Sequence, residues 1–283
     1  QVEEKMTGKR IALRFDVDTS ACIRTGMPAL LYLANKYNIP VTFYVNMGRA
    51  VSYKVIACRL FLKGKNIQGS IAKLSAFEKL GVMGVLQAAL VNPYVGKSNR
   101  EIIARSLKAG HEIGLHGGQN HAVWQFSASD WSRDEVEKQV AWGMKELCFL
   151  PNGSVTSFSS PGWSSNTLLP EILLTHGITV LADDHQSDRE GLLDRQSKGV
   201  TRINTNLAGE PGGVGYLESC EAKDISYQAM CESIAGKLSS FDSLVMYDHP
   251  SYAGGKGIGR LERLIIFLKG RGVDFTTVSG LAG

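Results

Sequence analysis

The segment RIALRFDVDT, residues 10–19, joins an apolar run to two closely spaced acidic residues. Residues 10–17 alternate in polarity and are rich in Ile, Leu, Val and Phe, which predicts a strand. Helical spacing follows over residues 26–38, and the apolar run at 39–46 predicts a second strand. This order of strand, helix and strand is typical of a parallel α/β unit.

The same alternation continues along the rest of the chain. Two capping boxes, Ser98 with Glu101 and Ser132 with Glu135, predict helix starts, and Gly110 predicts a helix end. Further strands are expected at residues 111–116, 153–161, 178–184, 243–249 and 273–281, and further helices at 97–110, 133–147, 166–177, 225–240 and 259–272. The pattern favours a parallel sheet or a (β/α) barrel, in which chemistry lies at the C-terminal ends of the strands.

Composition limits the class of protein. The chain has 283 residues, is 43% hydrophobic and contains no Pro/Ser linker, so one domain over residues 1–283 is expected. A net charge of +4, without a stripe of arginines and interleaved aromatics, gives no reason to expect nucleic-acid binding. The five cysteines are scattered and form no CxxC motif, which indicates neither a disulfide framework nor a zinc knuckle and favours a reducing compartment.

Residues 53–95 are expected to form a basic amphipathic insertion. Many Lys and Arg lie between residues 54 and 100, against a single acid, Glu78. One interpretation is a surface helix with a solvated charged face, and the other is a patch that rests on anionic lipid. No window reaches the roughly 18 apolar residues of a membrane span, and the N-terminus lacks the apolar run of a signal peptide. A protein that is soluble or peripheral on a membrane is therefore expected.

Acidic residues and histidines recur where the predicted strands end. Asp16 and Asp18 lie two positions apart, so they project on one face of the first strand together with Arg14. Because two carboxylates cannot both be buried without a partner, a cation must lie nearby. His116 ends a later strand, and Asp248 and His249 end a strand near the C-terminus.

Asp18, His116 and His121 form a candidate metal site. One carboxylate and two imidazoles suit Zn²⁺ with positions left open for water and substrate, and Asp16 would then be free to act as a base. The two histidines are five residues apart, which fits neither one face of a helix nor one face of a strand, so a loop or bulge is required between them. A turn or helix cap is the structural alternative for an Asp-x-Asp sequence at a strand end.

The segments RFDVDT, GHEIGLHGGQNH, SSPGW and VMYDHP resemble, in this order, the motifs of the polysaccharide deacetylase (NodB-homology) family. Over most of residues 10–250 the likeness is greatest to its branch of formamido-arabinose-phosphoundecaprenol deformylases and related polyprenyl-phosphate aminosugar deacetylases. The resemblance implies a distorted (β/α) barrel and a metal-dependent hydrolase of a linear amide C–N bond, with zinc as the expected ion. It also implies a formylated or acetylated amino sugar on undecaprenyl phosphate as substrate, in lipid A modification at the inner face of the cytoplasmic membrane.

The family pattern also implies roles for single residues. It makes Asp16 the catalytic base, makes Asp18, His116 and a second histidine the metal ligands, and makes His249 the general acid. Besides the metal, the backbone N–H groups of Gly162 or Trp163 are expected to bind the oxyanion. Asp248 adjoins His249 in the chain and should point away, so Asp184 is expected to orient that imidazole.

Two departures from the family pattern concern the site. The family usually places its second histidine four residues after the first, where this chain has Asn120; His121, one residue later, is taken as the ligand and Asn120 as its competitor. The deformylase branch carries histidine at both positions. The other departure is Ser159, which stands where most members have an arginine that pairs with the base; Arg14 or Arg189 is expected to substitute for it.

Alternative functions stay open at this stage. A deacetylase of another polysaccharide or of a small acylated amine would use the same groups. A barrel glycosidase would use two carboxylates about 5–9.5 Å apart but would leave the histidines without a role. Asn120 and the missing arginine would also suit a sugar-lipid binding protein that holds no metal.

Overall fold

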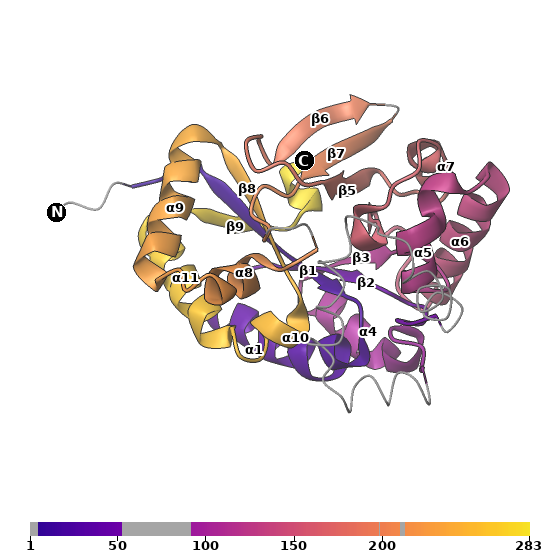
Figure 1. Ribbon diagram of the computed structural model, residues 1–283, viewed down its shortest axis with the longest axis horizontal. Coiled ribbons are helices and arrows are strands. Elements are labelled where there is room, and N and C mark those ends of the chain that lie inside the picture. The colour runs from indigo at the N-terminus through magenta and orange to yellow at the C-terminus, as the bar shows by residue number, and fades with distance from the viewer. Residues whose placement is uncertain (1–4, 53–91, 198, 210–212) are drawn as a thin grey trace, which may run out of the picture.

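The strands of the molecule form one sheet around the centre (Figure 1). The computed structural model describes residues 5–52, 92–197, 199–209 and 213–283, so most of the predicted insertion at 53–95 lies outside the described residues. Within these ranges the sheet has nine strands, in the spatial order β6-β7-β5-β4-β3-β2-β1-β8, with β9 also paired to β1. Their bounds are β1 (Arg10–Val17), β2 (Thr42–Val45), β3 (Glu112–His116), β4 (Ser157–Ser159), β5 (Val180–Asp184), β6 (Leu192–Ser197), β7 (Val200–Asn204), β8 (Ser243–Asp248) and β9 (Asp274–Thr276).

The segment that follows β7 brings the two sides of the sheet together. The backbone N–H of Leu207 donates to the carbonyl of Val245 at 3.0 Å, and the N–H of Tyr247 donates to the carbonyl of Leu207 at 2.9 Å. All pairings are parallel except that of β6 with β7. The result is a nearly closed (β/α) barrel, as the sequence predicts. The β6–β7 hairpin was not expected, because residues 192–197 (LLDRQS) lack the apolar alternation of a strand.

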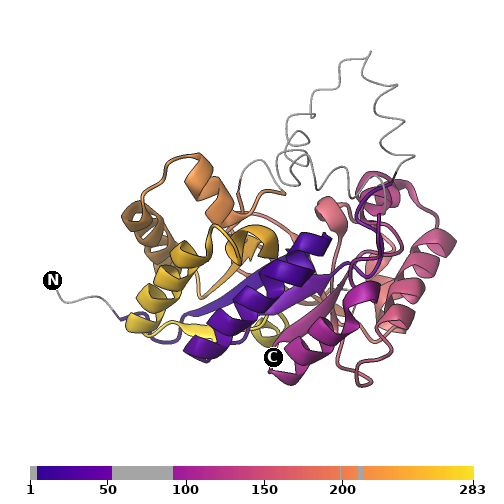
Figure 2. The ribbon, with the colours of Figure 1, turned by 90° about the horizontal axis from the view of Figure 1, so that it is seen from below.

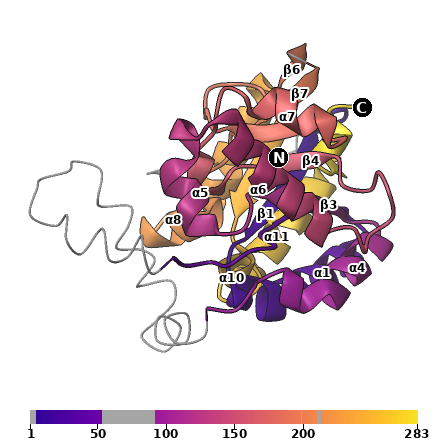
Figure 3. The same ribbon diagram turned by 90° about the vertical axis from the view of Figure 1, so that its right-hand side faces the viewer.

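Helices cover the outside of the barrel. In Figure 2, α1 (Met27–Tyr37) and α4 (Arg100–Lys108) lie side by side on one flank, and Figure 3 shows α5 (His121–Ser127), α6 (Arg133–Glu146) and α7 (Leu169–Thr175) on another. The opposite flank carries α9 (Tyr227–Ser240) and α11 (Ile258–Gly270) (Figure 1). Shorter elements line the ends: η1 (Cys22–Gly26), η3 (Lys97–Asn99), η4 (Ala128–Asp130), η5 (Pro161–Trp163), α8 (Tyr216–Ala222), α10 (Pro250–Ala253) and η6 (Ser279–Leu281).

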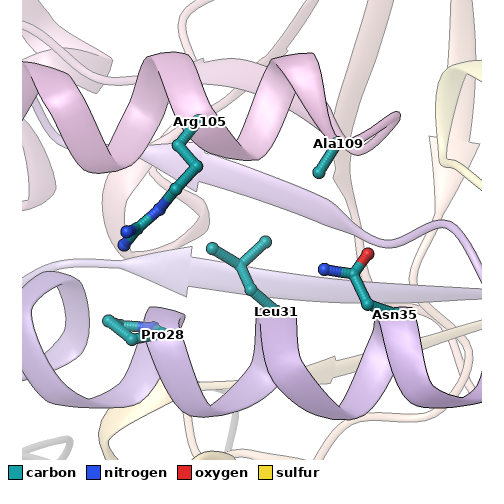
Figure 4. Close-up of a pocket in the computed structure, with 5 residues that line it drawn as sticks. All are labelled: Pro28, Leu31, Asn35, Arg105 and Ala109. Carbon is teal, nitrogen blue, oxygen red and sulfur yellow. The ribbon is translucent and has the colours of Figure 1, made fainter.

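The helix α1 shows how the apolar pattern becomes packing. Its apolar positions Met27, Leu30 and Leu33 are buried against the sheet, and it ends at Asn38, whose φ of 50° is left-handed. Where α1 and α4 meet at the surface they leave a shallow groove, lined by Pro28, Leu31, Asn35, Arg105 and Ala109 (Figure 4). This groove lies on the outer flank, away from the strand ends that carry the acidic residues and histidines.

The alternation of β1 separates two environments. The odd-numbered side chains from Ile11 to Val17 point outward into the main core beneath the helices, whereas Ala12 belongs to a smaller apolar cluster inside the barrel. The interior cluster also includes Tyr44, Val180, Ala182, Ile203, Val245, Val278 and Leu281. Arg14 and Asp16 continue the inward face of β1. The barrel interior is therefore apolar toward the N-terminal end of β1 and charged toward its C-terminal end.

The two predicted capping boxes differ in outcome. Ser132 Oγ accepts a hydrogen bond from the N–H of Glu135 at the start of α6, as predicted, although the Glu135 carboxylate bonds Gln139 instead of closing the box. The prediction of a capping box formed by Ser98 and Glu101 is wrong. Residues 97–99 form a 3₁₀ turn, and Asn99 precedes α4 with its side-chain amide bonded to the carbonyl of Val95 at 2.7 Å.

Close packing inside the barrel predicts the effect of one added methyl group. A Cβ at Gly114 in β3 would lie 2.4 Å from the Tyr44 ring and 2.7 Å from Ser157 Oγ, so Gly114→Ala should destabilise the protein by about 1–3 kcal/mol. Gly236→Ala in α9 is the control, because nothing lies within 4 Å of its added Cβ and it should stabilise the helix by about 0.5–1 kcal/mol. Urea unfolding measures both, and equal effects would contradict the tight packing of β3 against Tyr44.

Candidate active site

Side chains from the ends of three strands meet above the interior apolar cluster. Asp16 lies in β1, Asp18 follows it, His116 ends β3 and His249 follows β8. The carboxyl ends of parallel strands lie at the same edge of a barrel, so residues distant in sequence come together there. Asp18 lies 3.2 Å from His116 through Oδ1 and 3.2 Å from His249 through Oδ2.

The five-residue spacing of the two histidines is explained by a change of element. His116 is the last residue of β3, Gly117 turns the chain at φ 72°, and His121 is the first residue of α5. A side chain at Gly117 would meet Pro161, which also favours glycine at this turn. The expected loop therefore exists, and it places His121 Nε2 at 3.3 Å from Asp18 Oδ1.

Asn120, the predicted competitor of His121, is engaged elsewhere. Its side-chain oxygen accepts a hydrogen bond from the N–H of Val123 and caps α5, while its side-chain nitrogen donates to the carbonyl of Val51 at 2.8 Å. Both polar atoms of the amide thus have structural partners. The group that converges on one point consists of Asp18, His116 and His121, whose candidate ligand atoms all lie within 4.8 Å of one another.

This cluster has the features of a cation site. Among the described residues, Asp18 Oδ1 and His121 Nε2 are buried without a hydrogen-bond partner, a costly arrangement unless something binds between them. His116 Nδ1 contacts the carbonyl oxygen of Ser159 at 2.8 Å, which turns Nε2 toward Asp18. A hydrogen bond from the far nitrogen is the usual way to orient a ligating imidazole. The residues present therefore fit a divalent ion of the Zn²⁺ class.

The electrostatics of the cluster favour an ionised carboxylate. Burial alone would raise the pKa of Asp18, but the imidazoles of His121, His116 and His249 outweigh it and hold that pKa well below its usual value. Burial likewise acts to lower the pKa of His116, whereas the carboxylates of Asp16 and Asp18 raise it above its usual value. A cation bound in this cluster would likewise favour the ionised form of the Asp18 carboxylate.

Arg14 is the partner of Asp16. Its Nε donates to Asp16 Oδ1 at 2.9 Å and its Nη2 to Asp16 Oδ2 at 2.8 Å, in a fully buried bidentate ion pair. The remaining donors reach the carbonyl of Ala182 at 2.7 Å, Thr205 Oγ1 at 3.0 Å and Ser159 Oγ. All five N–H groups of the guanidinium are thus used.

Arg14, rather than a residue at position 159, pairs with Asp16. Ser159, at the position where the resemblance implies an arginine, accepts a hydrogen bond from Arg14. Arg189, the other candidate, is exposed in the loop after β5. Burial would lower the pKa of Arg14, but Asp16 raises it above its usual value, so the guanidinium stays charged.

Aromatic rings enclose the Arg14 guanidinium. Its carbon lies 5.0 Å from the centre of the Tyr44 ring, 4.4 Å from that of Trp163 and 5.4 Å from that of Tyr247. Trp163 in turn stacks against His185, with ring centroids 4.8 Å apart. A layer of rings therefore connects the buried charge pair with the rim of the barrel. Sequence reasoning did not predict this role for Tyr44 and Tyr247.

The loop after β4 contains Gly162 and Trp163, the two residues expected to donate to the oxyanion. Asp183 holds this loop by accepting hydrogen bonds from both the N–H and the Oγ of Ser160 at 2.6 Å. Gly162 and Trp163 both have a φ of 60°, which is strained for tryptophan. The N–H of Trp163 donates to the carbonyl of Ser160 at 3.1 Å, so the expectation for Trp163 as a backbone donor is wrong, and Gly162 remains the candidate.

Asp184 does not orient His249. Its carboxylate instead makes a bidentate ion pair with Arg202, at 3.0 and 2.5 Å. The register of β5 against β7 shifts between Leu181 and Asp184. The regular alternation that would point Asp184 inward with Ala182 is therefore broken. Asp183, rather than Asp184, contacts Ser160 in the loop after β4.

His249 has other neighbours. Its Nε2 lies 3.0 Å from the Tyr247 hydroxyl, and its Nδ1 lies 4.0 Å from Glu218 Oε2. Asp248 does point away from the ring, as expected, and accepts hydrogen bonds from the N–H groups of His249 and Leu217 at 2.9 and 2.8 Å. Burial raises the pKa of Asp248 to about 6. Sequence reasoning missed Glu218, which lies in a helix that carried no motif.

The buried ion pair predicts a large effect of removing one partner. Arg14→Met would leave the Asp16 carboxylate buried without its counter-charge and should destabilise the protein by about 3–5 kcal/mol. Adding Asp16→Asn should recover part of this loss, because no unpaired charge is then buried. Arg202→Met is the matched control: its ion pair with Asp184 lies at the exposed rim, and its loss should cost about 1 kcal/mol or less. Urea unfolding that gives equal losses for Arg14→Met and Arg202→Met would contradict this role of Arg14.

Comparison with known proteins agrees with this geometry. The sequence profile of the family described as Polysaccharide deacetylase matches residues 3–181. A protein of Shewanella sediminis named as the 4-deoxy-4-formamido-L-arabinose-phosphoundecaprenol deformylase ArnD is 30% identical over 159 residues, which are 54% of this chain and 50% of the relative. The match thus spans about half the length of that curated relative.

Solved structures share the fold. A Mycobacterium smegmatis protein classed as a polysaccharide deacetylase superimposes over 100% of this chain and 91% of its own, with a TM-score of 0.63 and 17% identity. A pseudoenzyme of the CE4 family from Bacillus anthracis superimposes over 97% of this chain and 66% of its own, with a TM-score of 0.53 and 13% identity. With a family profile that covers more than half of its residues, this chain belongs to the polysaccharide deacetylase family of hydrolases.

Proposed function

We propose that this protein is a metal-dependent deacylase that removes a formyl or acetyl group from the amino group of a sugar carried on a polyprenyl phosphate. The observation that carries the proposal is the convergence of Asp18, His116 and His121 on one point beside the charged pair of Arg14 and Asp16. Family membership supports acyl hydrolysis as the reaction class. The name of the Shewanella relative, a formamido-arabinose-phosphoundecaprenol deformylase, supports the lipid-linked amino sugar.

Asp18, His116 and His121 would hold the ion. A divalent ion there would polarise the acyl oxygen and lower the pKa of a water molecule beside it. The carboxylate and the two imidazole nitrogens leave positions open, the usual arrangement of catalytic zinc sites. His116 is fixed for this role by its contact with Ser159, and His121 by its place at the start of α5.

Asp16 would act as the general base. Its Oδ2 lies 3.8 Å from His116 Nε2, so the carboxylate borders the ligand cluster where an attacking water would lie. Arg14 donates a hydrogen bond to each carboxylate oxygen of Asp16, and each oxygen keeps a further lone pair that can accept a proton. The bidentate pair thereby fixes the orientation of the base.

His249 would act as the general acid. It approaches Oδ2 of Asp18, whereas His116 and His121 approach Oδ1, so the acid and the ligands lie on different sides of that carboxylate. In this position its Nε2–H can protonate the leaving amine nitrogen as the C–N bond breaks. The N–H of the exposed Gly162 would stabilise the oxyanion.

Two alternatives lose their support. A binding protein without metal was suggested by Asn120 in a ligand position and by the missing family arginine. Asn120 caps a helix while His121 lies in the proposed ligand cluster, and Arg14 pairs with Asp16, so neither observation still favours that alternative. A glycosidase would use Asp16 and Asp18 as its carboxylate pair, and the two histidines grouped around Asp18 would then have no role.

A lipid-linked substrate requires contact with a membrane. In the part of the chain that the structure describes, no helix is both long and apolar enough to cross a bilayer. We propose peripheral association with the inner face of the cytoplasmic membrane through the basic segment at 53–95, most of which lies outside the described residues.

Two aspartate variants separate the base from the ligand. Asp16→Asn should retain zinc but lower turnover by about 10²–10⁴, because the base alone is lost. Asp18→Asn should lose zinc affinity itself, because a ligand is lost. Zinc content by elemental analysis, together with formate or acetate release from formylated and acetylated amino sugars on polyprenyl phosphate, measures both quantities. Equal metal loss in the two variants would show that Asp16 is a ligand and that the base lies elsewhere.

The pair His121→Ala and Asn120→Ala completes this experiment. His121→Ala should lose zinc affinity, whereas Asn120→Ala should retain it and lose only about 1 kcal/mol of stability with the helix cap. Retention of zinc by His121→Ala, with loss by Asn120→Ala, would overturn the proposed ligand set. Wild-type protein that binds zinc but releases neither acid would instead overturn the proposed substrate class.

A further inference from the structure

The segment that follows β2 brings a second arginine close to the proposed metal ligands. Beyond the end of β2, the backbone of Arg49 is bridged to that of Tyr94 on one side and to that of Asn120 on the other. The N–H of Arg49 donates to the carbonyl of Gln119 at 3.0 Å, and the carbonyl of Arg49 accepts the N–H of His121 at 2.9 Å. One backbone hydrogen bond therefore joins Arg49 to a proposed ligand.

The Arg49 side chain is held by neutral groups. Its Nη1 donates to the carbonyl of Asn92 at 2.5 Å, and its guanidinium carbon lies 4.5 Å from the centre of the Tyr94 ring. The Tyr94 ring stacks in turn on Trp142, with ring centroids 6.1 Å apart. Among the described residues, no carboxylate forms an ion pair with Arg49. Its guanidinium is thus oriented, but its charge is not neutralised within the described part of the chain.

Two further cations lie beside this arginine. Lys97 Nζ lies 5.2 Å from the centre of the same Tyr94 ring. Lys97 and Arg100 share the carboxylate of Glu146, at 3.0 and 2.7 Å. Glu101, the next acidic residue along this turn, is exposed and, among the described residues, pairs with neither cation. The local excess of positive charge favours an anion, and the cation without a carboxylate is the one whose backbone contacts a proposed ligand.

We propose that the Arg49 guanidinium binds the phosphate group that joins the amino sugar to the polyprenyl chain. The planar N–H groups of a guanidinium match two phosphate oxygens, and the contact with the Tyr94 ring fixes that plane in advance. A substrate whose acyl group lies at the ligand cluster carries its phosphate across the width of one sugar ring. The inference rests on the proposed function and adds the residue that selects a phosphate-linked sugar over a free one.

The setting of Arg49 favours the phosphate of the substrate over that of a bilayer lipid. Arg49 is half-buried and anchored at the carbonyl of Asn92, whereas contact with a bilayer surface needs exposed cations. Lys97 and Arg100 have that character, with side chains 42% and 43% exposed. We therefore assign the substrate phosphate to Arg49 alone.

The kinetic test compares two substrates that differ only in the phosphate. Both carry the same N-formylated amino sugar on a short geranyl chain, joined through a phosphodiester in one and directly through a glycosidic bond in the other. Without vesicles in the assay, Arg49→Gln should raise KM for the phosphodiester about 10- to 100-fold, because one charge-assisted contact is lost. Its kcat, and both constants for the phosphate-free substrate, should change by less than about threefold, because only ground-state binding of the phosphate is lost.

Two further variants sharpen this comparison. Arg49→Lys keeps the charge but not the planar donors, so its KM for the phosphodiester should lie between those of wild type and Arg49→Gln. Arg100→Gln removes an exposed cation from the same surface, and its KM for both substrates should stay within about threefold of wild type. Equal losses on both substrates in Arg49→Gln would overturn the proposal. An unchanged KM for the phosphodiester, with weaker binding to phosphatidylglycerol vesicles, would also overturn it and assign Arg49 to the bilayer.

Calorimetry makes the test independent of turnover. The deacylated forms of the two compounds are not substrates, so their binding to the zinc-loaded protein can be measured directly. The phosphodiester should bind wild type about 10- to 100-fold more tightly than Arg49→Gln, and the phosphate-free compound should bind both proteins equally. Equal affinity of the two proteins for the phosphodiester would overturn the role of Arg49. Wild-type protein that binds the phosphodiester through Arg49 but hydrolyses neither substrate would support this role and overturn the proposed function alone.

Discussion

The bidentate ion pair of Arg14 with Asp16 is the interaction on which the upper part of the barrel depends. A guanidinium buried inside a barrel is tolerated only if its charge and all its N–H groups are satisfied. Here the donors reach β1 through Asp16, β4 through Ser159 and β5 through the carbonyl of Ala182, with Thr205 completing the set after β7. Arg14 therefore links strands that are not neighbours and fixes the carboxylate that we propose as the base.

The candidate site follows from this fixed centre. Asp18 lies two residues beyond Asp16, just after the end of β1. The turn at Gly117 and the helix cap at Asn120 bring His121 close to Asp18. The proposed base and the proposed ligands thus depend on different elements, the base on the barrel interior and the ligands on the loops above it. The rings of Tyr44, Trp163 and Tyr247 pack around the Arg14 guanidinium, while the side chains of Asp18 and His121 remain partly exposed at the rim.

Sequence reasoning recovered the parts that local chemistry determines. The apolar runs of β1 and β3 and their polar ends predicted the barrel, and the two-residue spacing correctly placed Arg14 and Asp16 on one face. It failed where geometry depends on distant contacts. Asp184, at the register shift in β5, pairs with Arg202 instead of His249. The N–H of Trp163 bonds the carbonyl of Ser160 in its own turn, and Glu218 lies near His249 only through the docking of α8.

Anomalous diffraction at the zinc edge, from crystals grown with zinc, tests the central claim most directly. The account predicts one strong peak about 2.0–2.2 Å from Asp18 and from Nε2 of His116 and His121, the usual zinc distances to oxygen and nitrogen ligands. Asp16 should stay paired with Arg14 outside the coordination sphere. A peak ligated by Asp16, or one at Glu218 and His249 with the first cluster left empty, would contradict it.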